Sequence, residues 1–116
     1  LGWMRPEALR SYLLYRQSPT LQAMEIAGFE WDDGNWPKCA KHGVSREEVE
    51  RLFLEGSARV APDLKHTTPM ESRHIAVGWV DGRAIFVAFA FRGKRIRPIS
   101  ARYMHAKEVS NYEASS

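Results

Sequence analysis

The chain has 116 residues, of which 44% are hydrophobic and 27% charged. This composition indicates one globular domain and excludes a disordered polyelectrolyte. No apolar run reaches the ~20 residues that span a bilayer, so the sequence predicts no association with a membrane. Cys39 is the only cysteine, which excludes a disulfide within the chain and a zinc site built on paired cysteines.

Positive charge is concentrated near the C-terminus. The whole chain is +3, whereas the stretch 92–107 has no carboxylate and six cations: Arg92, Lys94, Arg95, Arg97, Arg102 and Lys107. That stretch is therefore +6 and the remainder of the chain is −3. A block of one sign on a mildly acidic body is typical of a polyanion site, and a solvated basic face is the alternative.

The first 23 residues are expected to be an extension of upstream or artificial origin, because the chain begins with Leu1 and Met24 is a candidate start. Pro6 and Glu7 favour the first turn of a short helix there, which Ser18-Pro19 would end. Residues 24–116 are then expected to form a single domain. Its first elements are a strand over 29–31, a turn over 32–35 and a short helix over 36–41.

The next helix carries the clearest local signal. Ser45 and Glu48 form a capping box, and Val49, Leu52 and Phe53 make an apolar stripe at helical spacing. After Gly56 the apolar period changes to two, and Asp81-Gly82 predicts a tight hairpin turn. The expected strands cover 58–61, 74–80, 84–91 and 95–101, with a polar loop over 64–72 and a final helix between 104 and 112.

These elements predict an α+β fold in which helices pack on one antiparallel β-sheet. Small side chains at Ala84, Ala88 and Ala90 favour close packing of a helix on that face of their strand. Pro98 cannot donate to a sheet ladder, which indicates an edge or a bulge at that position.

The candidate chemistry lies mainly in arginines. Arg95 and Arg97 share one face of their strand, and a short turn brings Arg92 beside Arg95. Guanidinium groups bind phosphate bidentately and stay charged at physiological pH. Glu71 and Arg73 flank Ser72 and would share a face, so they form either a positioned carboxylate or an ordinary surface ion pair.

Lys41-His42 lies at the end of the short helix and is either an acid–base or phosphate contact or a simple helix cap. The four histidines show no metal-ligand spacing, so neither a metal nor another cofactor is predicted.

The ordered motifs of the chain resemble one known family. Phe29-Glu30-Trp31-Asp32 is followed by Lys41-His42-Gly43-Val44-Ser45 with Glu48, then by Asp63 with His66, Glu71 with Arg73, Gly82-Arg83, and the run from Ile96 to Met104. This order is similar to the BrnT family of toxins, the ribonuclease partners of type II toxin–antitoxin systems. The resemblance covers about 29–112 and leaves the N-terminal extension outside the family pattern.

The resemblance implies a RelE-like fold and a cytoplasmic bacterial endoribonuclease, a hydrolase that cuts mRNA and inhibits translation. It implies a BrnA-like DNA-binding antitoxin that neutralises the toxin and represses the shared operon with it, so that operator DNA is contacted only through the antitoxin. The catalytic residues it implies are Lys41, His42, Glu71, Arg73, Arg97 and Arg102. Three further cations are expected to bind RNA phosphates: Arg92, Lys94 and Arg95.

The expected reaction is metal-independent attack of a ribose 2′-OH on the adjacent phosphate. Glu71 or His42 would be the base, the arginines would stabilise charge on the phosphate, and Lys41 or His42 would support the leaving oxygen. Many family members carry two acidic residues before the arginine of the loop, and here Ser72 replaces the second. The alternative function is a non-catalytic module that binds nucleic acid or partners a repressor through the same cations.

Overall fold

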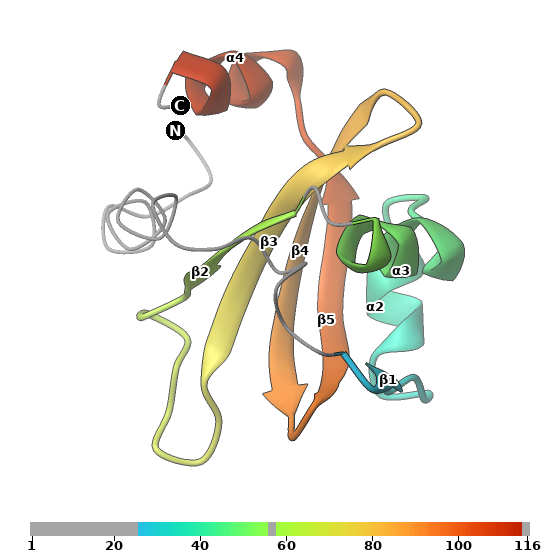
Figure 1. The fold of residues 1–116 in the computed structure, drawn as a ribbon, viewed down its shortest axis with the longest axis vertical. Coiled ribbons are helices and arrows are strands. Elements are labelled where there is room, and N and C mark those ends of the chain that lie inside the picture. Colours follow the sequence, from blue (N-terminus) through green and yellow to red (C-terminus); the bar gives the residue numbers. More distant parts are fainter. Residues whose placement is uncertain (1–25, 56–57, 115–116) are drawn as a thin grey trace.

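The computed structural model describes residues 26–55 and 58–114. The expected extension over 1–23 and its helix lie outside these residues, so both stay predictions. The described elements are β1 (Gly28–Phe29), α2 (Trp36–Ala40), α3 (Arg46–Leu54), β2 (Arg59–Pro62), β3 (Arg73–Val80), β4 (Arg83–Arg92), β5 (Arg95–Tyr103) and α4 (Ala106–Ala114). The α+β class is therefore confirmed (Figure 1).

The five strands form one sheet in the order β1-β5-β4-β3-β2. The four longer strands pair antiparallel, as expected, but β1 pairs parallel with β5 through Gly28 and Phe29, so the sheet is mixed. The prediction of a purely antiparallel sheet was wrong at this edge. Two residues are too few for an apolar period to define a partner, so the direction of pairing could not be predicted.

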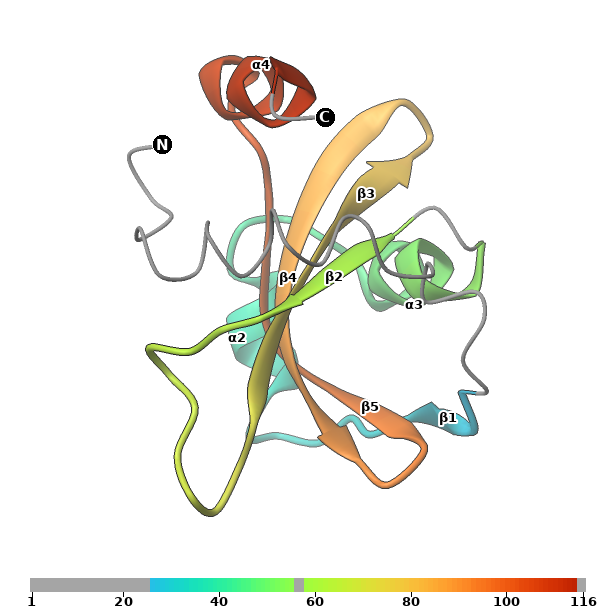
Figure 2. The ribbon, with the colours of Figure 1, turned by 60° about the vertical axis from the view of Figure 1, so that its left-hand side comes forward.

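Helices α2 and α3 cover one face of this sheet (Figures 1 and 2). The capping box is present, with Ser45 Oγ accepting from the Glu48 amide and the Glu48 carboxylate accepting from the Ser45 amide. Phe53 of α3 lies on Phe89 of β4, with ring centroids 5.0 Å apart. At Gly78 of β3 the helix approaches most closely, since an added Cβ would lie 2.6 Å from Leu52 Cδ1.

Within residues 26–55 and 58–114, helices α2 and α3 do not pack on the face that the alanines predicted. Both α2 and α3 contact the face of β4 that carries Ile85, Val87 and Phe89, whereas Ala84, Ala88 and Ala90 point to the opposite face. Both faces of β4 are apolar over most of its length. Alternation therefore could not identify the face that the helices cover.

Two turn predictions are confirmed. Asp81 and Gly82 both have positive φ, 51° and 77°, as a type I′ hairpin turn requires. The β4–β5 register shifts between Ala88 and Phe89, opposite Ser100 and Pro98, so Pro98 lies beside a β-bulge. Among the described strands, β1 pairs only with Arg95 and Ile96, so the outer side of β5 at Pro98 also lacks a neighbouring strand, and the Pro98 carbonyl accepts there from the Asn35 side chain.

The sheet has two ends that matter for the site. At one end the loop over 63–72 lies beside the β4–β5 turn, and Glu71 bonds Arg92 across the gap (Figures 1 and 2). At the other end Tyr103 Oη donates to Glu48 at the start of α3, at 2.7 Å. Helix α4 follows β5 and lies beyond this second end. Within the described residues, no helix is long and apolar enough to cross a membrane.

Candidate nucleic-acid interface and active site

The arginines of the sheet gather on the face opposite α2 and α3. Strand register places Arg73, Ala90 and Arg97 side by side on β3, β4 and β5, and Arg92 beside Arg95 one step along. Neighbouring strands are ~4.8 Å apart, so the Cα atoms of Arg73 and Arg97 are roughly 10 Å apart. The small side chain of Ala90 lies between them in register.

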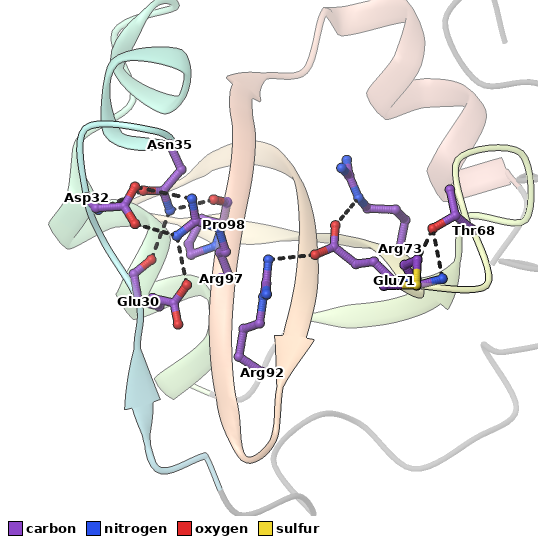
Figure 3. A network of polar contacts seen from close by, with 10 residues as sticks. Glu30, Asp32, Asn35, Thr68, Glu71, Arg73, Arg92, Arg97 and Pro98 are labelled. Carbon is purple, nitrogen blue, oxygen red and sulfur yellow. Dashed lines mark hydrogen bonds and ion pairs between the residues drawn. The ribbon is translucent and has the colours of Figure 1, made fainter.

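Glu71 is held between two of these arginines. Its Oε1 accepts from Arg73 Nε at 2.7 Å and its Oε2 accepts from an Arg92 guanidinium nitrogen at 2.6 Å (Figure 3). The carboxylate is 23% exposed, against 35% and 46% for the two arginine side chains. The predicted Glu71–Arg73 pair is therefore present, and Arg92 joins it from the neighbouring strand.

A tight turn sets the position of Glu71. Thr68 and Glu71 exchange backbone hydrogen bonds, with Thr68 N to Glu71 O at 2.9 Å and Glu71 N to Thr68 O at 3.2 Å. Pro69 occupies the second position of this turn, where its fixed φ is favourable. The Thr68 hydroxyl also accepts from the Glu71 amide, at 3.1 Å. The carboxylate thus leaves a backbone fixed by local bonds.

Arg97 belongs to a second polar group across β5. One of its guanidinium nitrogens donates to Glu30 Oε1 at 2.8 Å and to Asp32 Oδ2 at 2.9 Å (Figure 3). Hydrogen bonds from Arg97 hold the pKa of Asp32 below its usual value. The pKa of Arg97 is raised in return, first by its bond to Asp32. Only 17% of the Arg97 side chain is exposed, so it is a well-anchored cation.

Asn35 fixes the backbone beneath this second group. Its amide nitrogen donates to Glu30 O at 2.9 Å and to Pro98 O at 2.7 Å, and its Oδ1 accepts from Asp32 N. Asn35 is buried, with 2% of its surface exposed. It therefore ties the chain after β1 to the bulged part of β5. Sequence reasoning placed it only in a turn, because no local signal shows a partner 63 residues away.

Arg102 lies farther along the same sheet face, where it pairs with Phe86 in register. It makes a bidentate pair with Glu108 of α4, at 2.9 and 2.7 Å. Burial raises the pKa of Glu108, but the bonds from Arg102 and the His105 amide outweigh it, and the net pKa lies below its usual value. This pair anchors α4 to the sheet.

Lys41 and His42 lie near the other end of the sheet. They follow α2 directly and precede Ser45, whose helix begins beside Tyr103. Eight residue steps separate Arg95 from Tyr103 along β5, which is roughly 25 Å at ~3.3 Å per residue. The structure therefore brings Glu71, Arg73, Arg92, Arg95 and Arg97 together and does not bring Lys41 or His42 to them. Both of these side chains are exposed.

The expected phosphate-binding cations surround the β4–β5 turn. Arg92 and Arg95 are a register pair on either side of Gly93-Lys94, and all three cations are exposed. Arg95 donates to Phe29 O at 3.0 Å, so its guanidinium is drawn toward β1. Gly93 has φ 61°, the left-handed region that favours glycine in a tight turn.

His74 is the site residue that sequence reasoning did not select. Its Nδ1 is buried and has no hydrogen-bond partner in the described structure. Burial lowers the pKa of His74, against smaller opposing effects of the Ser72 backbone and Asp63. Cys39 is fully buried in the core, and burial raises the pKa of its thiol to about 11. We therefore assign Cys39 to the core and not to the site. Over 26–55 and 58–114, His, Cys, Asp and Glu side chains form no group of three that could hold a metal ion.

The fold and this face define a small α+β protein with an arginine-rich sheet surface, and guanidinium is a side-chain group that binds phosphate well. Residues 31–108 match the family described as the ribonuclease toxin, BrnT, of type II toxin–antitoxin systems. The chain belongs to this BrnT family, and the predicted resemblance is confirmed. Membership implies an antitoxin partner. No curated protein matches the sequence.

Proposed function

We propose that this chain is a metal-independent endoribonuclease that cleaves mRNA and thereby inhibits translation. The observation that carries the proposal is the Glu71 carboxylate held by Arg73 and Arg92 on an arginine-rich sheet face. A carboxylate fixed beside two guanidinium groups offers a proton acceptor and a phosphate site within one side-chain length.

In this mechanism Glu71 takes the proton of a ribose 2′-OH, and the 2′ oxygen attacks the adjacent phosphorus. The bond to the 5′ oxygen breaks, and that oxygen takes a proton from water. The products are a 2′,3′-cyclic phosphate and a 5′-hydroxyl end. Arg73 and Arg92 stabilise the extra negative charge that develops on the phosphoryl oxygens.

The remaining expected site residues bind the RNA strand away from the scissile phosphate. Arg97 and Arg102 extend the cationic face along the sheet, and Lys94 and Arg95 contact phosphates at the hairpin end. Lys41 and His42, which lie near the Tyr103 end of β5, then contact a part of the RNA away from the scissile phosphate. The strand register supports this assignment of roles. The expected residues then form an extended RNA-binding surface and not one compact active site.

We propose a RelE-like relationship for the fold, on the ground of the helices on one sheet face. The partner we propose is a BrnA-like DNA-binding antitoxin, present with the toxin in the bacterial cytoplasm. It covers the arginine face and represses the operon jointly with the toxin. Co-purification from a strain that expresses both genes, followed by a gel shift on the operator, tests this partnership. Operator binding by the toxin alone would contradict it.

Product analysis on a short RNA tests the reaction. We expect full activity in EDTA, a 2′,3′-cyclic phosphate end, and no cleavage of the same RNA with a 2′-deoxyribose at the scissile position. Cleavage of the 2′-deoxy substrate would exclude attack by the 2′ oxygen. Salt-dependent RNA binding without any cleavage would instead favour the non-catalytic module.

A further inference from the structure

One cavity is lined in part by Glu71 and Arg92, and the proposed reaction gives no role to its other lining residues. It has a volume of about 550 Å³ and lies between the end of the 63–72 loop and the β4–β5 hairpin. The loop side contributes Met70, Glu71 and Ser72, and the strands contribute His74, Phe91 and Arg92. A volume of this size lies within the range of sites that hold small ligands.

Aromatic rings form one wall of the cavity. The Phe91 ring meets His74 edge to face, with centroids 4.9 Å apart and an interplanar angle of 75°. Phe89 supports Phe91 from behind, at 5.2 Å. Met70 lies at the rim with 94% of its surface exposed. Aromatic faces and polarizable thioethers of this kind bind planar ligands by stacking.

The polar groups of the cavity exclude a purely apolar ligand and a simple anion. His74 Nδ1 is buried without a partner among the residues described, although buried polar atoms are normally bonded. Arg92 adds donors, and the Glu71 carboxylate adds an acceptor that repels an anion placed in the cavity itself. A ligand that presents a flat π surface, an acceptor for Arg92 and a donor for Glu71 suits these lining groups.

We propose that this cavity is a nucleobase subsite, which receives the base of the nucleotide whose phosphate is bound by Arg92. The inference rests on the proposed ribonuclease function, because Arg92, which is proposed to bind the phosphate, also lines the cavity. The space beside Gly93, which also lines the cavity, is open, since a Cβ added there would meet nothing within 4 Å. The subsite makes Met70, His74 and Phe91 determinants of cleavage-site preference.

Nucleotide titration by NMR tests the subsite directly. The protein is labelled at its methionine methyl groups, and the Met70 signal is assigned by its loss in Met70→Ala. The probes are the four nucleoside 3′-monophosphates, with inorganic phosphate and ribose 5-phosphate as controls at equal ionic strength. We expect at least one nucleotide to shift the Met70 methyl and His74 imidazole signals saturably, beyond the shift with either control. Equal shifts with nucleotide and phosphate would overturn the proposal.

A second experiment separates the subsite from the ribonuclease function. Cleavage sites are sequenced for the wild type, Met70→Ala and His74→Phe on a random RNA pool, with Leu64→Ala as the matched control. Leu64 is an exposed loop residue, and it does not line the cavity. We expect both cavity variants to change the base preference beside the cut at least threefold and the control to leave it unchanged. Cleavage with unaltered preference in both variants would refute the subsite and leave the ribonuclease intact. Saturable nucleotide binding without RNA cleavage would support the subsite as a binding site and refute the ribonuclease.

Discussion

Replacing Glu71 by glutamine tests whether Glu71 is a catalytic base or only holds Arg73 and Arg92 in position. Glutamine keeps the size of the side chain but has one carbonyl oxygen, so it accepts from only one of Arg73 and Arg92. Loss of a general base lowers a rate by about 10²–10⁴-fold, which corresponds to about 3–5 kcal/mol in activation free energy. RNA binding should tighten, because a negative charge leaves the phosphate site.

The cost of the same substitution to folding is small. Both ion pairs are partly exposed, and such pairs contribute about 0–1 kcal/mol each. Losing one of them lowers the free energy of unfolding by about 1 kcal/mol, and the Tm by about 4 °C for a domain of this size. The variant therefore stays folded at 25 °C, and its loss of rate reports on chemistry.

The assay is single-turnover cleavage of a short RNA, together with fluorescence anisotropy on the same sequence carrying 2′-O-methyl groups. Glu55→Gln is the matched control, because Glu55 also pairs with an arginine but lies at the C-terminal end of α3, on the other side of the sheet. A Glu71→Gln rate within threefold of this control would show that Glu71 is not the base. A loss of affinity equal to the loss of rate would assign Glu71 to positioning Arg73 and Arg92.

Three further predictions concern the second polar group, His74 and the cations. Asn35→Ala removes the hydrogen-bond partner of the Glu30 and Pro98 carbonyl oxygens and of the Asp32 amide. We expect the free energy of unfolding, measured by urea denaturation, to fall by about 2–3 kcal/mol. The pKa of His74 is lowered in the folded state, so the unfolded state binds more protons between the two pKa values, and stability should fall as pH drops below about 6.5. His74→Phe should flatten this part of the stability–pH curve, and an unchanged curve would contradict the burial argument. The logarithm of RNA affinity should fall with log salt with a slope shallower than about −4, the value expected if all six cations of 92–107 bind phosphate, because carboxylates already pair with Arg92, Arg97 and Arg102. A measured slope near −4 would contradict this argument.

Local signals predicted much of the fold. The capping box at Ser45 and the Asp81-Gly82 turn depend on residues that are neighbours in sequence, and both are present as expected. The pairing of β1 and the face covered by the helices depend on long-range packing, and neither could be predicted from alternation. A two-residue strand has no period, and β4 is apolar on both faces.

The same distinction applies to the candidate site. The Glu71–Arg73 pair and the Arg92–Arg95 pair follow from a period of two and a short turn, and the structure contains both. The carboxylate partners of Arg97, Glu30 and Asp32, are 67 and 65 residues away in the sequence. A local sequence pattern therefore could not predict these ion pairs. Lys41-His42 has a clear motif, but a motif does not give its distance from Glu71.

The six cations of 92–107 do not make a surface of charge +6. Three of the arginines form ion pairs with carboxylates from other parts of the sequence. These pairs are Arg92 with Glu71, Arg97 with Glu30 and Asp32, and Arg102 with Glu108. The phosphates of RNA must therefore share or displace carboxylates that already orient the guanidinium groups. Arginine side chains that are already held in place lose little conformational entropy when RNA binds. The same carboxylates reduce the net positive charge of the face and so weaken its long-range attraction for RNA. Alignment rather than net charge is then the property through which this face would distinguish an RNA strand from other polyanions.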